Sequence, residues 1–395
     1  MLFIAEPSDY MDTVSYLFEQ MGELVLLAGN AEAAMERALE FGADGIVTFS
    51  EHLLPITAAF AERLGLPFHS RDVVEGLRKK DVQRERLRRG GVDEVRTRTI
   101  VRLSDWDQAV REIGLPLVLK PTLGAGSRDT HLVTDIESGA LICKEFLSRT
   151  QTSNPELLIA EEYLAGRSMS PWGDYVSVES VITRGRVLHL GVTGKLPLLP
   201  PFRESGQFFP STLDPLDLQS VTDLAERAVE ALGVTEGVTH TEIKLTNQGP
   251  RIIEVNGRMG GYMHELYGRG LEANVLEIVT RLACGQEVDV PASRPGAVHF
   301  QYLHQPPHGA TRFVDVMGGR DVSRHPQVTS YRRLAELGTD LPSDPRTFDL
   351  DLLCGRAGSH SEMLRVLDEC QEYLTFTFDS PEGIFVMGGR EVGER

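Results

Sequence analysis

The segment from Thr239 to Gly261 constrains this chain more than any other. It reads THTEIKLTNQGPRIIEVNGRMGG, which predicts two strands joined by a tight turn at Asn247-Gln248-Gly249. Folding this hairpin about Gln248 places Glu242 opposite Glu254, because the two positions are equidistant from that centre. The two carboxylates are therefore expected side by side on one face of the hairpin.

Strand alternation sorts the other residues of the hairpin into two faces. Lys244 and Asn256 share the face of the two glutamates, and the opposite face is predicted to hold the apolar residues Ile243, Leu245, Ile253 and Val255. One face of the hairpin is thus polar, and the other is expected to pack into a core.

Two carboxylates directly across a ladder repel each other, so their placement calls for a compensating cation. Carboxylate and amide oxygens without thiolates suit Mg²⁺ or Mn²⁺, which predicts Glu242, Glu254 and Asn256 as metal ligands. The alternative is a solvent-facing strand pair whose carboxylates are neutralised by Lys244 and Arg258.

The residues after the hairpin favour the metal site. Arg258 continues the polar face, and Gly260-Gly261 precede an apolar-periodic stretch that predicts a helix. Glycines before a helix leave backbone N–H groups free for an anion. The pattern indicates a place where a divalent cation and phosphate meet.

Composition limits the class of protein. The chain has 395 residues, of which 41% are hydrophobic and 25% charged, which is typical of a soluble protein with two or three domains. A net charge of −18 argues against nucleic acid and anionic membranes as partners. Four scattered cysteines, no secretion signal at the start and no apolar run of membrane-spanning length predict a cytoplasmic protein.

Residues 1–75 alternate strand and helix signals, which predicts a βαβ domain with a parallel sheet and helices on both faces. Strands are expected at 1–6, 23–29 and 44–50, with a short last strand after Leu66-Pro67. No G-x-G-x-x-G follows the first strand, so a scaffold role is expected for this part.

Two lysines point to a phosphate clamp in the middle of the chain. Lys80 and Arg84 lie one turn apart on a basic helix, which is otherwise interpreted as a solvated face. Lys120 interrupts an apolar strand and is followed by the small loop 122–127, whose backbone N–H groups suit phosphate. The alternative for Lys120 is a side chain that points out of the core.

Two further segments are candidates for binding. LLIAEEYLAG, residues 157–166, predicts a strand whose end either exposes charge to water or contacts a purine through its backbone. The Pro- and aromatic-rich stretch 196–213 is predicted to be a substrate-lining loop, with Lys195, Phe202, Glu204 and Phe208 at the acceptor pocket.

In this order, Lys80, Lys120 with its glycine loop, EEYL and HTEIKLT-x3-PRIIEVNGRMGG resemble the ATP-grasp superfamily, over roughly residues 40 to 285. More narrowly, the chain resembles ATP-dependent carboxylate–amine ligases, which include bacterial L-amino acid ligases. The resemblance implies an α/β and α+β multidomain fold with three parts. These are a Rossmann-like domain over 1–75, an ATP-grasp domain of two subdomains that clamp ATP over 76–290, and a small α+β domain over 291–395.

The resemblance also implies roles for individual residues. Residues expected to contact the ATP phosphates are Lys80, Lys120, Gly124, Gly126 and Ser127, and the adenine hinge is expected at Glu161, Glu162, Tyr163 and Leu164. Glu242, Glu254 and Asn256 would hold Mg²⁺, and Arg258 with Lys120 would assist phosphoryl transfer. Residues expected near the substrate are Lys195, Glu179, Gly260, Gly261 and His264, with Glu179 also a candidate for the ribose.

The implied reaction joins two small molecules, a carboxylate and an amine, through an acyl phosphate, and amino acids are the expected substrates. Two alternatives stay open: a carboxylase of the biotin-carboxylase type and a non-catalytic nucleotide-binding protein. Members of the family are often dimers, so the resemblance admits a homodimer.

Overall fold

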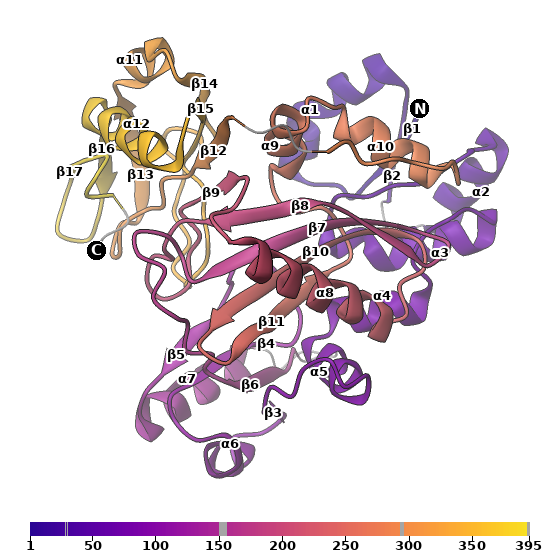
Figure 1. Ribbon diagram of the computed structural model, residues 1–395, viewed down its shortest axis with the longest axis horizontal. Coiled ribbons are helices and arrows are strands. Elements are labelled where there is room, and N and C mark those ends of the chain that lie inside the picture. The colour runs from indigo at the N-terminus through magenta and orange to yellow at the C-terminus, as the bar shows by residue number, and fades with distance from the viewer. Residues whose placement is uncertain (28, 30, 150–155, 293–295, 393–395) are drawn as a thin grey trace.

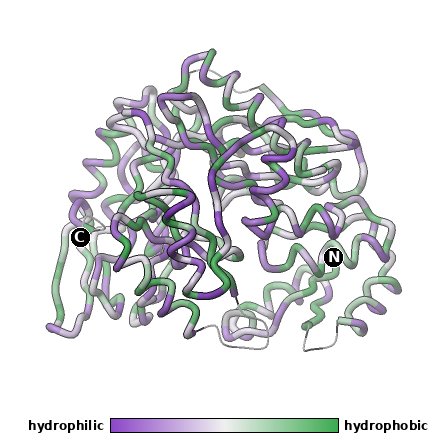
Figure 2. Tube along the Cα trace, turned by 90° about the horizontal axis from the view of Figure 1, so that it is seen from below, coloured by the Kyte–Doolittle hydropathy of each residue, from purple (hydrophilic) through white to green (hydrophobic). Residues whose placement is uncertain are grey.

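A computed structural model describes residues 1–27, 29, 31–149, 156–292 and 296–392, which form a mixed α/β molecule (Figure 1). Within these residues the strands make four sheets: β1-β2, β3-β6-β4-β5, β11-β10-β7-β8-β9-β12-β15-β14 and β13-β16-β17. The first strand β1 and the last strand β17 lie on opposite sides of the molecule, as do the chain ends marked in Figure 2. No helix among the described residues has the length and apolar character needed to cross a membrane.

The amino-terminal part has fewer strands than the sequence predicts. Its elements are β1 (Leu2–Ala5), α1 (Asp9–Met21), β2 (Glu23–Leu26), α2 (Ala31–Phe41), the 3₁₀ helix η1 (Glu51–Leu53) and α3 (Leu54–Leu64). Strands β1 and β2 pair in parallel. The predicted strands at 44–50 and after Leu66-Pro67 are wrong, because both segments are irregular. Residues 46–49 instead line a small apolar pocket with Val279 and Leu282.

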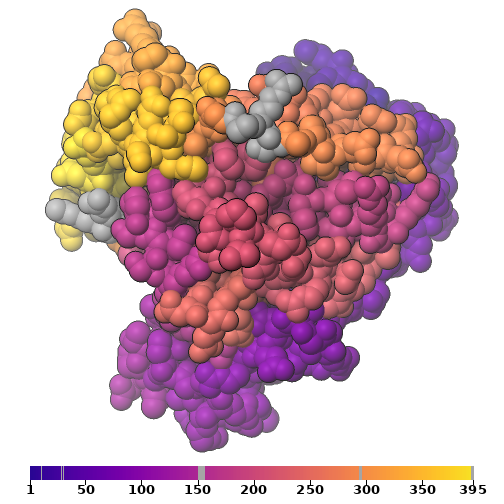
Figure 3. Space-filling view, in the orientation of Figure 1, coloured from indigo at the N-terminus to yellow at the C-terminus, as the bar shows by residue number. Residues whose placement is uncertain are grey.

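The next part of the chain forms a lobe that projects below the large sheet in Figures 1 and 3. Helices α4 (Arg71–Arg78) and α5 (Lys80–Arg89) lead into it, so the predicted basic helix is interrupted at Lys79. The lobe contains β3 (Thr97–Ile100), α6 (Asp105–Ile113), β4 (Leu117–Pro121), β5 (His131–Val133), α7 (Ile136–Arg149) and β6 (Leu158–Glu162). Its core packs the buried Trp106 and Phe146 against Leu117, Leu119 and Leu158.

The large sheet carries the predicted hairpin at one end. Its first strands are β7 (Tyr175–Thr183), β8 (Arg186–Lys195), β9 (Gly206–Phe209), β10 (Gly237–Thr246) and β11 (Gly249–Asn256). Helix α8 (Pro215–Ala231) contributes Leu224, Ala228 and Val229 to a core that also holds Ile243 and Ile252. The predicted helix after Gly261 is split into α9 (Met263–Gly270) and α10 (Val275–Ala283).

The sheet continues into the carboxy-terminal part without a break, because β9 pairs with β12. The elements here are β12 (Val298–Tyr302), β13 (Arg312–Met317), α11 (Gly319–Arg324), β14 (Val328–Arg333), β15 (Asp351–Ala357), α12 (His360–Tyr373), β16 (Thr375–Asp379) and β17 (Phe385–Gly388). Phe208 of β9 shares one core with Phe300, Phe313 and Phe376. The large sheet therefore crosses the boundary expected near residue 290.

Candidate active site

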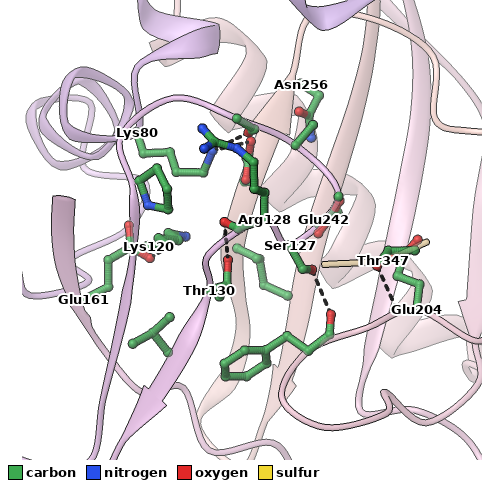
Figure 4. A pocket seen from close by; sticks show the side chains of 18 of the residues that line it. Lys80, Lys120, Ser127, Arg128, Thr130, Glu161, Glu204, Glu242, Asn256 and Thr347 are labelled. Atoms are coloured by element: carbon green, nitrogen blue, oxygen red, sulfur yellow. Dashed lines mark hydrogen bonds and ion pairs between the residues drawn. The ribbon is translucent and has the colours of Figure 1, made fainter. Parts of the chain in front are cut away.

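A cavity of about 330 Å³ lies between the lobe and the large sheet, where β4 and β6 face the β10–β11 hairpin. Most of the predicted site residues line it: Lys80, Lys120, Gly124, Gly126, Ser127, Glu161, Glu162, Tyr163, Leu164, Glu242, Glu254, Asn256, Arg258 and Gly261. Figure 4 shows several of these side chains converging on the cavity from separate elements.

The hairpin places Glu242 opposite Glu254, as the sequence predicts, but by a different route. The turn is tighter than expected, since Thr246 pairs with Gly249. A β-bulge then shifts the register between Glu242 and Ile243 and restores the predicted pair. The assignment of Ile253 to the core face is therefore wrong: Ile252 is buried in the core and Ile253 lines the cavity.

Each hairpin carboxylate has a cationic neighbour. Lys80 Nζ lies 3.2 Å from Glu254 Oε1, and His240 Nε2 lies 3.3 Å from Glu242 Oε1. The alternative in which Lys244 and Arg258 neutralise the pair does not hold, because Lys244 Nζ binds Asp174 at 2.6 Å and Arg258 Nε lies 3.4 Å from Glu51.

The donor chemistry of this face fits a divalent cation that also binds phosphate. Glu242, Glu254 and Asn256 offer carboxylate and amide oxygens to one cavity. Among the described residues, no three His, Cys, Asp or Glu side chains gather as a self-sufficient metal site. Mg²⁺ is commonly held by one or two carboxylates together with nucleotide phosphates, so two glutamates and an amide suffice for such a cation.

A buried ion-pair network lies beneath the cavity. Glu161 accepts hydrogen bonds from Arg84 Nε at 2.8 Å and Arg84 Nη2 at 3.0 Å, and Lys120 Nζ lies 2.8 Å from its second oxygen. Burial alone raises the pKa of Glu161, but the charges of Arg84 and Lys120 outweigh it and lower that pKa to about 2. Glu161 is thus the counter-ion that holds Lys120 at the cavity wall.

Arg84 also joins the lobe to the hairpin. Its Nη1 donates to the Ile252 carbonyl and its Nη2 to the Ile253 carbonyl, both at 2.7 Å. Residue Arg84 is 4% exposed, so all of these contacts are made away from water. One side chain of α5 therefore fixes the distance between β6 and β11, the two walls of the cavity.

The predicted adenine hinge follows β6 at the cavity edge. The side-chain carboxylate of Glu162 accepts hydrogen bonds from Arg96 Nε at 2.5 Å and from Arg251 Nη2 at 3.5 Å. Tyr163 and Leu164 continue along the cavity in irregular backbone. Such backbone is what a purine edge requires for hydrogen bonds to N–H and C=O groups.

The glycine loop is tied to two distant segments, as Figure 4 shows in part. Ser127 Oγ donates to the Phe202 carbonyl at 2.7 Å, and the Gly126 carbonyl accepts from Thr347 N–H at 2.8 Å. Thr347 Oγ1 in turn accepts from Glu204 N–H at 3.2 Å. Thr347, in the carboxy-terminal part, thus connects the predicted phosphate loop 122–127 with the segment that carries Phe202 and Glu204, here called the acceptor loop.

Five predicted substrate residues do not line the cavity: Glu179, Lys195, Phe208, Gly260 and His264. Phe208 is instead buried in a core. His264 is exposed on α9. Lys195 is 2% exposed and lies behind Glu204, with Nζ 3.2 Å from that carboxylate and 3.0 Å from Gln207 Oε1. Lys195 therefore supports the cavity wall from behind.

Glu179 and Gly260 belong to a buried cluster behind Glu242. Glu179 is fully buried, pairs with His240 Nδ1 and accepts from Gly260 N–H at 3.1 Å. Burial lowers the pKa of His240, but the Glu179 carboxylate outweighs it and raises that pKa to about 9. His240 is therefore a cation between two carboxylates. Glu179 is buried away from the cavity, with a partner on each oxygen, and is not placed to bind a ribose there.

Several cavity residues were missed by sequence reasoning: Arg128, Tyr175, His240 and Thr347. His240 carried a signal, since it precedes Glu242 by two positions and alternation places both on one face. Thr347 carried none, because it reaches the cavity only through the packing of a distant segment.

Comparison with known proteins agrees with this geometry. Residues 113–265 match the model of the ATP-grasp domain. The chain has an ATP-grasp fold. A solved L-amino acid ligase from Bacillus licheniformis superposes on this ATP-grasp chain with a TM-score of 0.79, covering 95% of this chain and 98% of that one at 22% identity.

Several curated relatives are ligases or synthases by name. Alanine–anticapsin ligase from Bacillus subtilis is 30% identical over 278 residues, which are 66% of this chain and 58% of that protein. Human carnosine synthase 1 is 28% identical over 292 residues, which are 67% of this chain and 33% of that protein. The chain thus spans a little over half the length of the first relative and a third of the second.

Proposed function

We propose that this protein is an ADP-forming carboxylate–amine ligase that uses ATP and a divalent cation, with an amino acid as one substrate. The observation that carries the proposal is the composition of one cavity. Lys80, Lys120 and Arg258 bring positive charge to the same space as Glu242 and Glu254. Phosphoryl transfer from a nucleotide needs this combination of cations for the phosphates and carboxylates for a metal.

The reaction has two steps. An oxygen of the substrate carboxylate attacks the γ-phosphorus of ATP, the bond to the β-phosphate oxygen breaks, and ADP leaves. The amine nitrogen of the second substrate then attacks the acyl carbon, the carbon–oxygen bond to phosphate breaks, and the nitrogen loses a proton. Activation is needed because a free carboxylate is a poor electrophile in water, whereas phosphate is a good leaving group.

Each group of cavity residues has its own role in this reaction. Lys80, whose Nζ contacts both Glu254 of the hairpin and the Gly124 carbonyl of the glycine loop, and Lys120 of β4 neutralise phosphate oxygens. A divalent cation held by Glu242, Glu254 and Asn256 supplies charge neutralisation at the phosphates when bound. Arg258 stabilises charge on the transferring phosphoryl group and on the acyl phosphate, because a preorganised guanidinium acts most strongly where charge develops.

The acid and the amine bind at the wall formed by the loop 196–205. The rest of the predicted loop 196–213 is not a loop throughout, because it contains strand β9. Phe202 and Leu198 give this wall apolar surface, and Glu204 gives it one carboxylate backed by Lys195. An anionic side chain beside apolar surface suits a substrate that carries an ammonium group. Alanine–anticapsin ligase, whose name gives an amino acid as a substrate, supports an amino acid substrate for this chain.

The test is a substrate screen with hydroxylamine as a generic amine. The protein is incubated with ATP, Mg²⁺ and a panel of amino acids and other carboxylic acids, and hydroxamate, ADP and AMP are measured together. Hydroxamate and ADP in equal amounts with one class of acid would support the proposal. ADP formation that depends on bicarbonate alone would favour the carboxylase alternative, and ATP binding without turnover would favour a nucleotide-binding protein.

A further inference from the structure

The amino-terminal part contacts the loop that carries Arg258 at two places. The first is His69, whose Nε2 lies 3.0 Å from the Gly257 carbonyl and donates to it. His69 is 3% exposed and sits in a slot that two glycines create. A Cβ at Gly237 would come within 2.5 Å of the imidazole, and a Cβ at Gly257 within 3.5 Å. The backbone beside Arg258 is thereby fixed from outside the cavity.

The second contact reaches the guanidinium itself. Glu51 starts the 3₁₀ helix η1, and its Oε2 lies 3.4 Å from Arg258 Nε. Both side chains are nearly enclosed, with 14% of Glu51 and 16% of Arg258 exposed. Arg258 Nη1 donates to the Met259 carbonyl at 3.0 Å, so the guanidinium is bound both through Nε and through Nη1.

Glu51 is poorly satisfied by the fold alone. Its buried Oε2 accepts no hydrogen bond from the described residues, although it forms an ion pair with Arg258. Burial raises the pKa of Glu51, an effect that nearby Glu254 reinforces and Arg258 opposes. A buried carboxylate oxygen without a hydrogen bond lowers the stability of the fold, so its presence indicates a functional role.

We infer that Glu51 is a positioning residue that holds the Arg258 guanidinium at the γ-phosphate end of the cavity. The inference rests on the proposed function. Without the carboxylate, the arginine side chain is free to turn toward Glu254 or the phosphates of bound ATP. A displacement of about 1 Å in a group that stabilises the transition state costs on the order of 100-fold in rate. The amino-terminal part thus contributes to catalysis through Arg258.

Charge-neutral and charge-retaining variants separate positioning from folding. Glu51→Gln keeps the size of the side chain and removes its charge, and kcat is expected to fall about 10- to 100-fold with KM for ATP within about twofold. Glu51→Asp keeps the charge and is expected to retain more activity than Glu51→Gln. The matched control is Glu62→Gln on α3, which breaks an exposed ion pair with Arg71 and should leave kcat unchanged.

A double-mutant cycle with Arg258→Lys distinguishes a positioning role of Glu51 from a purely structural one. If Glu51 acts through Arg258, adding Glu51→Gln to Arg258→Lys causes no further loss of kcat. Independent losses that multiply, or a Glu51→Gln variant with normal kcat and only a lower melting temperature, would overturn the inference. An active wild type matched by Glu51→Gln overturns this positioning role alone, whereas a wild type without ATP-dependent turnover overturns the proposed function itself.

Discussion

Glu242 and Glu254 face each other across the β10–β11 ladder, and each is paired with a cation from a different element of the fold. Glu254 is next to Lys80 at the start of α5, and Glu242 is next to His240 on its own strand. Repulsion between the two carboxylates is offset in this way in the ligand-free protein. Under the proposed function, a divalent cation bound with the nucleotide would offset the same repulsion and leave Lys80 available to phosphate.

Replacing Glu254 by Gln tests this arrangement. The change removes a charge and a metal ligand while keeping the shape, so ADP formation is expected to fall more than tenfold, corresponding to more than about 1.4 kcal/mol. The rate is measured across a Mg²⁺ titration, with Glu226→Gln on the exposed side of α8 as the control. A variant that keeps more than about a tenth of the rate would show that the metal site is misassigned.

The Glu161 network predicts a loss of stability in acid. The pKa of Glu161 is about 2 in the folded protein against an ordinary value of 4.5. A carboxylate with a depressed pKa stabilises the fold fully above its unfolded pKa, so its contribution, about 3 kcal/mol, is lost as pH falls from about 4.5 to about 2.

Glu161→Gln should remove that part of the pH dependence and destabilise the protein at pH 7. The reason is that Arg84 and Lys120 stay buried without their counter-ion, which costs about 3 to 5 kcal/mol. Urea unfolding at pH 3 and pH 7 measures both effects. Equal pH dependence in the two proteins would contradict the assignment of Glu161 as the buried counter-ion.

Adjacent glycines should differ sharply in their tolerance of a methyl group. A Cβ at Gly260 would lie 2.6 Å from His240 Nδ1, whereas a Cβ at Gly261 meets nothing within 4 Å. Gly260→Ala is therefore expected to lower the free energy of unfolding by about 1 to 3 kcal/mol, and Gly261→Ala by less than about 0.5 kcal/mol. Thermal unfolding of the ligand-free variants decides the comparison, and similar melting temperatures would refute it.

Thr347 is expected to matter for substrate binding because it links the glycine loop to the acceptor loop. Thr347→Val keeps the backbone bond to Gly126 but removes the acceptor for Glu204 N–H. The loss should cost about 1 kcal/mol in stability and raise KM for the acid substrate several-fold. Thr347→Ser retains the hydroxyl and should behave like the wild type, so equal KM values for the two variants would argue against the link.

Local pattern predicted the polar face of the hairpin, although the detail of the turn was wrong. A two-residue turn and a bulge produce the same Glu242–Glu254 pair as the three-residue turn inferred from spacing. Spacing constrains the pairing, but a bulge depends on twist and packing that no single strand encodes. This is why Ile253 was assigned to the wrong face.

Non-local contacts set the limits of the sequence prediction. Lys120 stands out in its apolar strand, whereas Lys80 is one of several cations on a basic helix, and only the fold brings the two to one cavity. Glu179 appears as a polar residue in an apolar strand, yet only the fold shows that His240 and Gly260 occupy its oxygens. The predicted strand at 44–50 illustrates the same limit. Ile46 packs against the core of α2 and α3, Val47 and Phe49 are exposed, and the segment joins no ladder.

The continuous order β8-β9-β12-β15 has a consequence for recombining this chain with its relatives. A chimera joined near residue 290 would separate β12 from its ladder partner β9 and split the core shared by Phe208 and Phe300. Exchange of substrate preference between such enzymes is better attempted by transplanting the loop 196–205 alone, which leaves every strand of the large sheet with its own neighbours.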